Sequence, residues 1–259
     1  MKHPKLAAAG VALAALLAVG GCTSDAGDQP TPAADGTATG PAADAEPAVV
    51  LAAAARKVDE QSYRLTVNDG AAGDGTTLVW DPKGRRGLET TSLAVANGKV
   101  TIERLTTGAD VYVKVTAPDR RVPVWDGRTW WHIGTAGKAS TAATAGLDMT
   151  RVASTLSASG TSRRTGERAY AGTLDLRGRA DVLGKGVDGV LGDRAAAVPF
   201  TAELDGQGRL VRYRLEVAAE QGRTAALDLT YADFGLPVSA EKPAAELIGE
   251  DPPGNIPGV

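Results

Sequence analysis

This 259-residue chain has one cysteine and two histidines, the residues most used in covalent and metal chemistry. The single cysteine, Cys22, excludes a disulfide within the chain, so the apolar core must stabilise the fold. Beyond the N-terminal segment the sequence has one histidine, His132, which excludes a zinc site built on several histidines. Because Trp131 and Ile133 flank it, we interpret His132 as a strand residue with its ring at the surface.

The chain also has no net positive charge and few aromatic side chains. The formal charge is −3 and both signs are scattered along the chain, so the sequence lacks the basic surface that a nucleic-acid partner requires. Aromatic residues make up 4% of the chain and include two Phe. A domain with so few large side chains must either pack tightly or leave space inside.

The apolar run at the start of the chain is too short to cross a bilayer, which takes about 20 residues. It extends from Leu6 to Val19, follows two lysines and ends in small residues, which is the layout of a secretory signal over 1–21. Val-Gly-Gly-Cys also resembles the lipobox of bacterial lipoproteins, which implies that Cys22 is acylated and becomes the first mature residue. The alternative is an ordinary cleaved signal with a cysteine nearby.

Composition divides the rest of the chain. Residues 22–46 contain Pro, Gly, Asp and Thr but no large apolar side chain, so we predict a flexible, lipid-anchored linker. A folded domain is expected over 47–248, and a Pro-rich C-terminal tail over 249–259.

Hydrophobic periodicity predicts a helix over 47–58, opened by Pro47, and a second helix that includes Val152 and Leu156. Elsewhere, apolar residues alternate with polar ones, as in half-buried strands joined by tight turns such as Asn97-Gly98. Runs of strands punctuated by helices indicate an α+β fold, in which a strongly curved antiparallel sheet carries the helices on one face.

A curved sheet of this kind can enclose an apolar cavity. Strand periodicity alone selects the residues expected to line it: Leu65, Val67, Val113, Leu174, Leu215 and Leu229. Trp125, Trp130 and Trp131 form a candidate aromatic surface for a ligand or a membrane interface. The alternative is cross-strand packing, and the adjacent Trp130 and Trp131 must point to opposite faces of a strand.

Two segments match known functional motifs in sequence but not in structural context. The segment from Gly184 to Gly189 spells the dinucleotide fingerprint, but no buried strand precedes it and no βαβ unit surrounds it. Asp233-Phe234-Gly235 spells the kinase magnesium motif without any other kinase segment, so we expect a turn at a strand end. The sequence therefore predicts no catalytic residue, no metal site and no cofactor.

The element order and two C-terminal segments, Glu203 to Val217 and LTYADFGLPVSAEKPAAELI, resemble the LppX/LprG-type lipoproteins of actinobacteria. Those proteins share a fold with the LolA/LolB lipoprotein carriers and the sensor RseB. The resemblance spans approximately Ala48 to Leu247, together with the lipobox at Cys22. It implies a LolA/LppX-like half-barrel with helices packed on its concave face and an apolar cavity for acyl chains.

These observations predict a monomeric, non-catalytic lipoprotein on the extracytoplasmic face of the cell membrane. It would be anchored through lipidated Cys22 and would bind, carry or present lipids. The alternative is a non-catalytic surface or envelope-signalling module of the same fold that binds another envelope protein. Large side chains that fill the concave face would argue against a carrier.

Overall fold

The computed structural model describes residues 46–68, 75–118, 126–135, 148–159, 161–177, 192–218 and 224–249, which belong to one compact unit of residues 38–259. Its α-helices are α1 (Pro47–Val58) and α3 (Met149–Ser157). Its strands are β1 (Tyr63–Asn68), β2 (Gly75–Asp81), β3 (Arg86–Val95), β4 (Gly98–Thr107), β5 (Asp110–Thr116), β6 (Trp130–Thr135), β7 (Arg163–Arg164), β8 (Ala169–Leu174), β9 (Val198–Leu204), β10 (Leu210–Ala218), β11 (Thr224–Ala232) and β12 (Ile248–Gly249). Two short 3-10 turns are η3 (Gly192–Ala197) and η5 (Ala245–Leu247). None of the described helices is both long and apolar enough to span a membrane.

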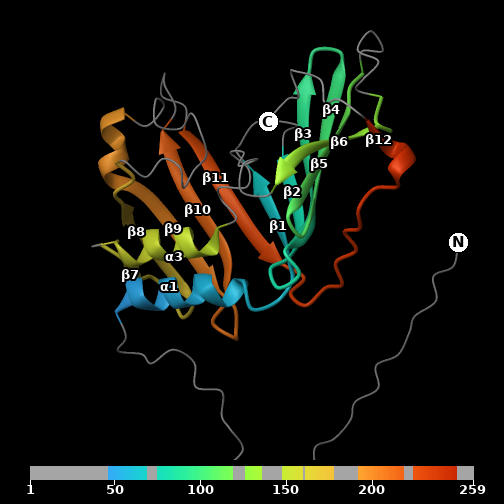
Figure 1. Ribbon diagram of the computed structural model, residues 1–259. Coiled ribbons are helices and arrows are strands. Elements are labelled where there is room, and N and C mark those ends of the chain that lie inside the picture. Colours follow the sequence, from blue (N-terminus) through green and yellow to red (C-terminus); the bar gives the residue numbers. More distant parts are fainter. Residues whose placement is uncertain are drawn as a thin grey trace, which may run out of the picture. The chain divides into compact units, whose positions relative to one another are not determined.

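All twelve described strands form one sheet, in the order β12-β6-β5-β4-β3-β2-β1-β11-β10-β9-β8-β7. Two antiparallel meanders, β1–β6 and β7–β11, meet where β1 pairs with β11 (Figure 1). The short β12 pairs in parallel with β6, which makes the sheet mixed. The two strands at the ends of the sheet, β12 and β7, have two residues each.

This architecture corrects the predicted fold class. The expectation of an α+β, LolA/LppX-like half-barrel, a strongly curved antiparallel sheet with helices on its concave face, is wrong. The described chain is mainly β: one mixed, open sheet of twelve strands with two α-helices. Period-2 patterns indicate individual strands, but they give no sign that both meanders pair into a single sheet with a parallel strand at its end.

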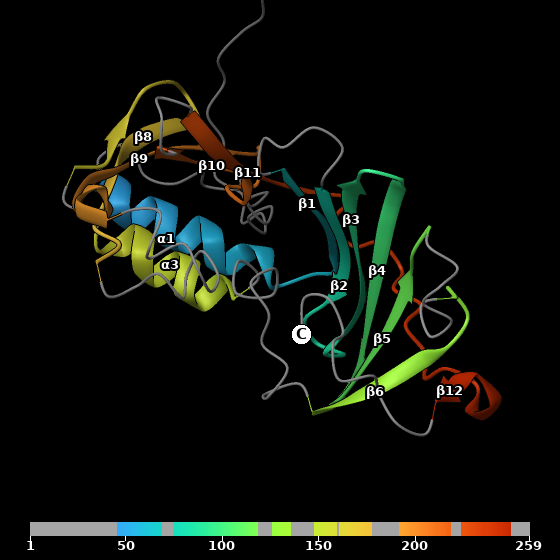
Figure 2. The same ribbon diagram turned by 90° about the horizontal axis from the view of Figure 1, so that it is seen from above.

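Local sequence explains both helices. Helix α1 begins at Pro47, is rich in alanine and ends with Arg56 and Lys57, which suit the negative end of the helix dipole. Helix α3 is capped by Asp148, whose Oδ1 accepts hydrogen bonds from the backbone N–H groups of Thr150 (3.0 Å) and Arg151 (3.2 Å). The predicted helix over 47–58 is confirmed. Figure 2 shows α1 and α3 side by side near β8–β11.

The alternation predicted for the last strands is confirmed with one exception. In β9, Val198, Phe200, Ala202 and Leu204 are buried while the residues between them are exposed. In β10, strict alternation from Tyr213 predicts that Val211 faces inward, but Leu210 is buried in its place. A register shift between Leu210 and Arg212 gives β10 one more residue than β9 at this point. This extra residue reverses which side chains face inward, so Leu210 and not Val211 is buried.

Candidate ligand-binding site

The largest apolar cluster lies between the two helices and one half of the sheet. We call it the helix–sheet cluster; it combines buried residues of α1, α3, β1, β2 and β8–β11. Its largest fully buried side chains include Tyr63, Tyr231, Phe200, Leu51 and Met149. Helix α1 contributes six residues to the cluster, three of which are alanines: Ala52, Ala54 and Ala55.

Most of the predicted cavity residues meet in this cluster. Leu65, Leu174, Leu215 and Leu229 are core members with exposed fractions of 0–3%, and Val67 is half-buried against them. Val113 lies elsewhere, in a smaller cluster with Ile102, Val115 and Trp131. Leu65, Val113, Leu174, Leu215 and Leu229 are thus buried, as their inward strand positions predicted, and they have almost no accessible surface.

The tryptophans point in two directions, as their adjacency requires. Trp131 is buried against Val113, whereas Trp130 packs with Leu105 and Tyr112 on the other face of the sheet, where the Lys114 ammonium lies 4.6 Å from its ring centroid. Both indoles thus take part in cross-strand packing, which was the alternative to an aromatic surface for a ligand or membrane. Trp125 and Cys22 lie outside the described residues.

Three buried tyrosine hydroxyls, which the sequence did not single out, mark the helix–sheet cluster. The side chains of Tyr63, Tyr213 and Tyr231 are 0–2% exposed, and their hydroxyl groups have no hydrogen-bond partner among the described residues. Leaving a polar group buried without a partner costs about 1–3 kcal/mol. The available signal was the occurrence of tyrosine at inward positions of the strand alternation.

Two carboxylates mark the end of the helix pair near these tyrosines. Asp59 caps the C-terminus of α1 and Asp148 caps the N-terminus of α3. Burial, and after it the charge of Asp148, raises the pKa of Asp59 to about 6. The charge of Asp59 in turn adds to the burial that raises the pKa values of Tyr63 and Tyr231. These tyrosines therefore stay protonated and keep a hydroxyl proton to donate.

We expect Asp59→Asn to stabilise the protein at neutral pH but not in acid. The ionised carboxylate is disfavoured in the folded state, so its stability contribution is fully present below about pH 4 and is lost as the pH rises through about 6. The rise from 3.8 to about 6 corresponds to at most about 3 kcal/mol. Solvent screening of this partly exposed group reduces the expected gain to about 1–2 kcal/mol.

Urea unfolding at several pH values measures this effect. The variant and the native chain should have equal stability near pH 4, diverge up to about pH 6 and remain apart by a constant amount above it. Glu60→Gln, a change at the exposed neighbouring residue, serves as the control and should not open such a difference. If the free energies of unfolding of Asp59→Asn and the native chain differed by the same amount at every pH, the ionised form of Asp59 would not be disfavoured in the folded state.

A buried ion pair interrupts the apolar face of the sheet next to the cluster. Arg104 Nη1 lies 3.0 Å from Glu89 Oε1, and the two side chains are 5% and 6% exposed. The two residues pair directly between β3 and β4, with Leu78 on the β2 side and Val113 on the β5 side. Burial raises the pKa of Glu89, while Arg104 partly offsets this shift. The pair thus separates the helix–sheet cluster from the smaller one around Trp131.

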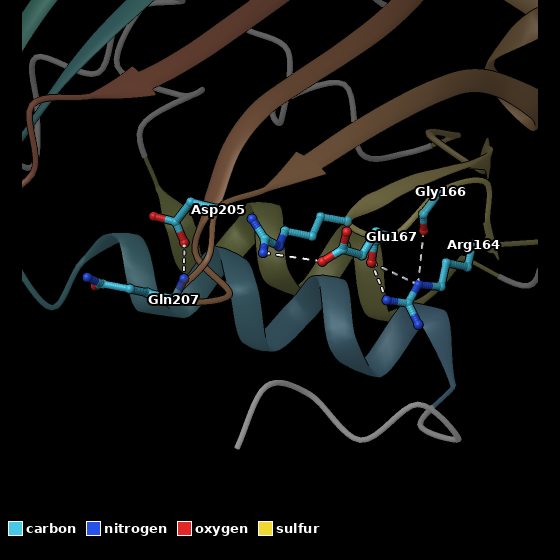
Figure 3. A network of polar contacts seen from close by, with 6 residues as sticks. Arg164, Gly166, Glu167, Asp205 and Gln207 are labelled. Atoms are coloured by element: carbon cyan, nitrogen blue, oxygen red, sulfur yellow. Dashed lines mark hydrogen bonds and ion pairs between the residues drawn. The ribbon is translucent and has the colours of Figure 1, made fainter. Parts of the chain in front are cut away.

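Polar contacts at two hairpin turns lie over α1 (Figure 3). In the β7–β8 turn, Arg164 donates hydrogen bonds to the backbone carbonyls of Gly166 and Glu167. In the β9–β10 turn, Asp205 accepts a hydrogen bond from the backbone N–H of Gln207 at 2.9 Å. The Lys57 ammonium, near the end of α1, donates to the Gln207 carbonyl at 3.0 Å. This solvent-exposed contact ties the helix to the edge of the cluster.

Two candidate catalytic features lie in the described chain: the Asp233-Phe234-Gly235 turn, whose Phe234 packs against the helix–sheet cluster, and His132 on β6. His132 Nε2 is 3.0 Å from Asp110 Oδ1 at the surface, as its strand position predicted. Asp233-Phe234-Gly235 forms the expected turn after β11, where Asp233 pairs with Arg64 at 2.8 Å. The segment 184–189 lies outside the described residues. In the described ranges no group of three or more metal-binding side chains comes together.

Comparison with known proteins adds little to this geometry. No family model matches the chain, and no curated protein matches it. A solved structure, that of an uncharacterized conserved protein from Thermus thermophilus, is similar over 77% of this chain and 96% of that one, at 13% identity and a TM-score of 0.39. A likeness this distant carries no functional argument, and the LppX/LprG resemblance stays a prediction.

Proposed function

We propose that this protein is a non-catalytic, monomeric lipoprotein, anchored to the outer face of the cell membrane through Cys22, that binds acyl lipids in the helix–sheet cluster. The observation that supports this proposal is the apolar layer between two helices and the sheet, where half of the residues that α1 contributes are alanines. Burial of apolar surface contributes roughly 25 cal/mol per Å². Alanine buries little area, so each alanine of α1 that leaves the sheet loses little of this free energy, and an acyl chain in its place would supply it again.

Lipid binding requires movement of the helices. Leu65, Leu174 and Leu215 have almost no exposed surface while α1 and α3 cover them. An acyl chain would therefore enter as the helix pair moves away from the sheet, and the exposed contact between Lys57 and Gln207 would break. In this mechanism the closed cluster is the ligand-free state.

Native mass spectrometry of the full chain purified from its own membranes tests the function directly. We expect acyl lipid to co-purify reproducibly, both with the native chain and with a Cys22→Ser form that lacks the anchor. Protein that is empty in both forms would contradict lipid binding and favour the alternative, a module of this chain that binds another envelope protein.

A reversible crosslink tests the required movement. Because Cys22 is the single cysteine, Cys22→Ser combined with Lys57→Cys and Gln207→Cys places two unique thiols where α1 meets the β9–β10 turn. A bifunctional thiosulfonate should abolish lipid uptake from vesicles of the protein's own membrane lipids, and a reductant should restore it. The two single-cysteine variants, treated alike, control for thiol modification. Uptake by the crosslinked protein would rule out entry beneath α1.

A further inference from the structure

The three buried tyrosines form a diagonal across neighbouring strands. Tyr213, Tyr231 and Tyr63 lie on β10, β11 and β1. Leu229 pairs with Tyr213, and Tyr231 lies two residues beyond Leu229 on β11. Leu65 pairs with Tyr231, and Tyr63 lies two residues before Leu65 on β1. Neighbouring tyrosines are therefore diagonal neighbours in the sheet. The rings of Tyr63 and Tyr231 meet edge to face, with centroids 5.8 Å apart.

This diagonal leads from the end of the helix pair into the apolar cluster. Asp59, four residues before Tyr63 in the chain, lies close enough to Tyr63 and Tyr231 for its charge to raise the pKa of both hydroxyls. One end of the line is thus the partly exposed Asp59, and the other is the deeply buried Tyr213, whose ring packs against Phe200.

Phenylalanine at these positions would fill the same volume without a buried hydroxyl. Three hydroxyl groups without a partner among the described residues are therefore available to an acceptor atom on a bound ligand. Because the tyrosines are neutral, they can donate a proton to an acceptor atom. An anionic group is disfavoured, since Asp59 and Asp148 stand where the line begins.

We propose that Tyr63, Tyr213 and Tyr231 form a polar subsite that binds an uncharged carbonyl group, such as the ester carbonyl of an acyl lipid. This inference rests on the proposed function, because the ligand must first enter beneath the helices. Up to two of the hydroxyls donate at a time to the carbonyl oxygen, which has two lone pairs, while the acyl chain contacts the surrounding leucines. The subsite would select an ester over a plain hydrocarbon of equal length.

Methyl palmitate and octadecane, two probes of equal chain length delivered from cyclodextrin, test this selectivity on the full chain. The native protein should prefer the ester, and Tyr63→Phe, Tyr213→Phe and Tyr231→Phe should each weaken ester binding by about 2- to 12-fold and leave octadecane binding unchanged. The infrared carbonyl band of labelled methyl palmitate should shift to lower frequency on the native protein and less on the variants. Tyr112→Phe, in a different apolar cluster, is the matched control.

Thermal unfolding without ligand supplies an independent readout. Removing a hydroxyl that has no partner should leave the melting temperature of the free protein unchanged or raise it. A lower melting temperature in all three variants would mean that the hydroxyls are already paired, for example to buried water, and would overturn the subsite. Equal binding of both probes would also overturn it but leave lipid binding intact, whereas binding of neither probe would overturn the proposed function together with the subsite.

Discussion

Replacing Arg104 with methionine is expected to lower the free energy of unfolding by about 3–5 kcal/mol at neutral pH. Arg104 and Glu89 are paired at 3.0 Å in the interior, with each side chain about 95% buried. Their mutual attraction offsets the cost of removing two charges from water. With Arg104 gone, the carboxylate of Glu89 remains buried without that compensating charge.

The pH dependence of this variant follows from the same carboxylate. Burial already raises the pKa of Glu89, and Arg104 limits the rise, so Arg104→Met should raise it further. A raised carboxyl pKa contributes stability that is present in acid and lost as the pH increases through it. The destabilisation measured by urea unfolding should therefore shrink as the pH is lowered.

The double variant Glu89→Leu/Arg104→Met is the control for this prediction. Replacing a buried ion pair by apolar side chains of similar volume is often neutral or stabilising by about 1–4 kcal/mol, so the double variant should recover the loss of the single one. A double variant as unstable as Arg104→Met would show that packing around the pair, and not the unpaired charge, dominates its contribution.

Phe200→Ala is expected to destabilise the protein by about 3–5 kcal/mol in chemical unfolding. Phe200 is 2% exposed within the helix–sheet cluster, and its ring lies 6.1 Å from that of Tyr213. It also packs over Gly172 of the neighbouring strand, where a Cβ atom would lie 2.8 Å from the ring. Truncation removes these contacts and leaves a void in the middle of the cluster.

Two further variants separate packing from strand propensity. Phe200→Leu keeps most of the volume and should cost clearly less than Phe200→Ala, while Thr201→Ala changes the exposed neighbour on the same strand and should stay within about 0.5 kcal/mol. A loss below about 1 kcal/mol for Phe200→Ala would show that the helices settle into the void. That result would itself indicate a mobile helix pair.

Local features of the fold could be read from the sequence because their causes are local. The helix over 47–58 follows from its proline, its alanines and its basic end, and β9 follows from strict alternation. The Asn97-Gly98 signal marked a real hairpin, although the two-residue loop begins one residue earlier and Gly98 opens β4 with a φ of 135°. Short-range geometry decides each of these elements.

Features that depend on distant pairing could not be predicted. The inward-facing side of β10 depends on an extra residue in the strand, which is visible only in its register with β9. The alternation placed Tyr63, Tyr213 and Tyr231 inside, but whether their hydroxyls find partners depends on three strands from both ends of the domain. The fold class was wrong for the same reason, since pairing across the whole chain sets the extent of the sheet.

The pairing of β1 with β11 also constrains when the sheet can be completed during folding. It joins the first strand of the domain to one of its last, so the longest loop in the sheet must close before the two halves become one. Contacts so far apart in sequence slow folding. A chain that emerges N-terminus first, from a ribosome or through a translocation pore, therefore cannot complete its sheet until nearly all of it has emerged, and until then β1 presents an unpaired edge to other chains.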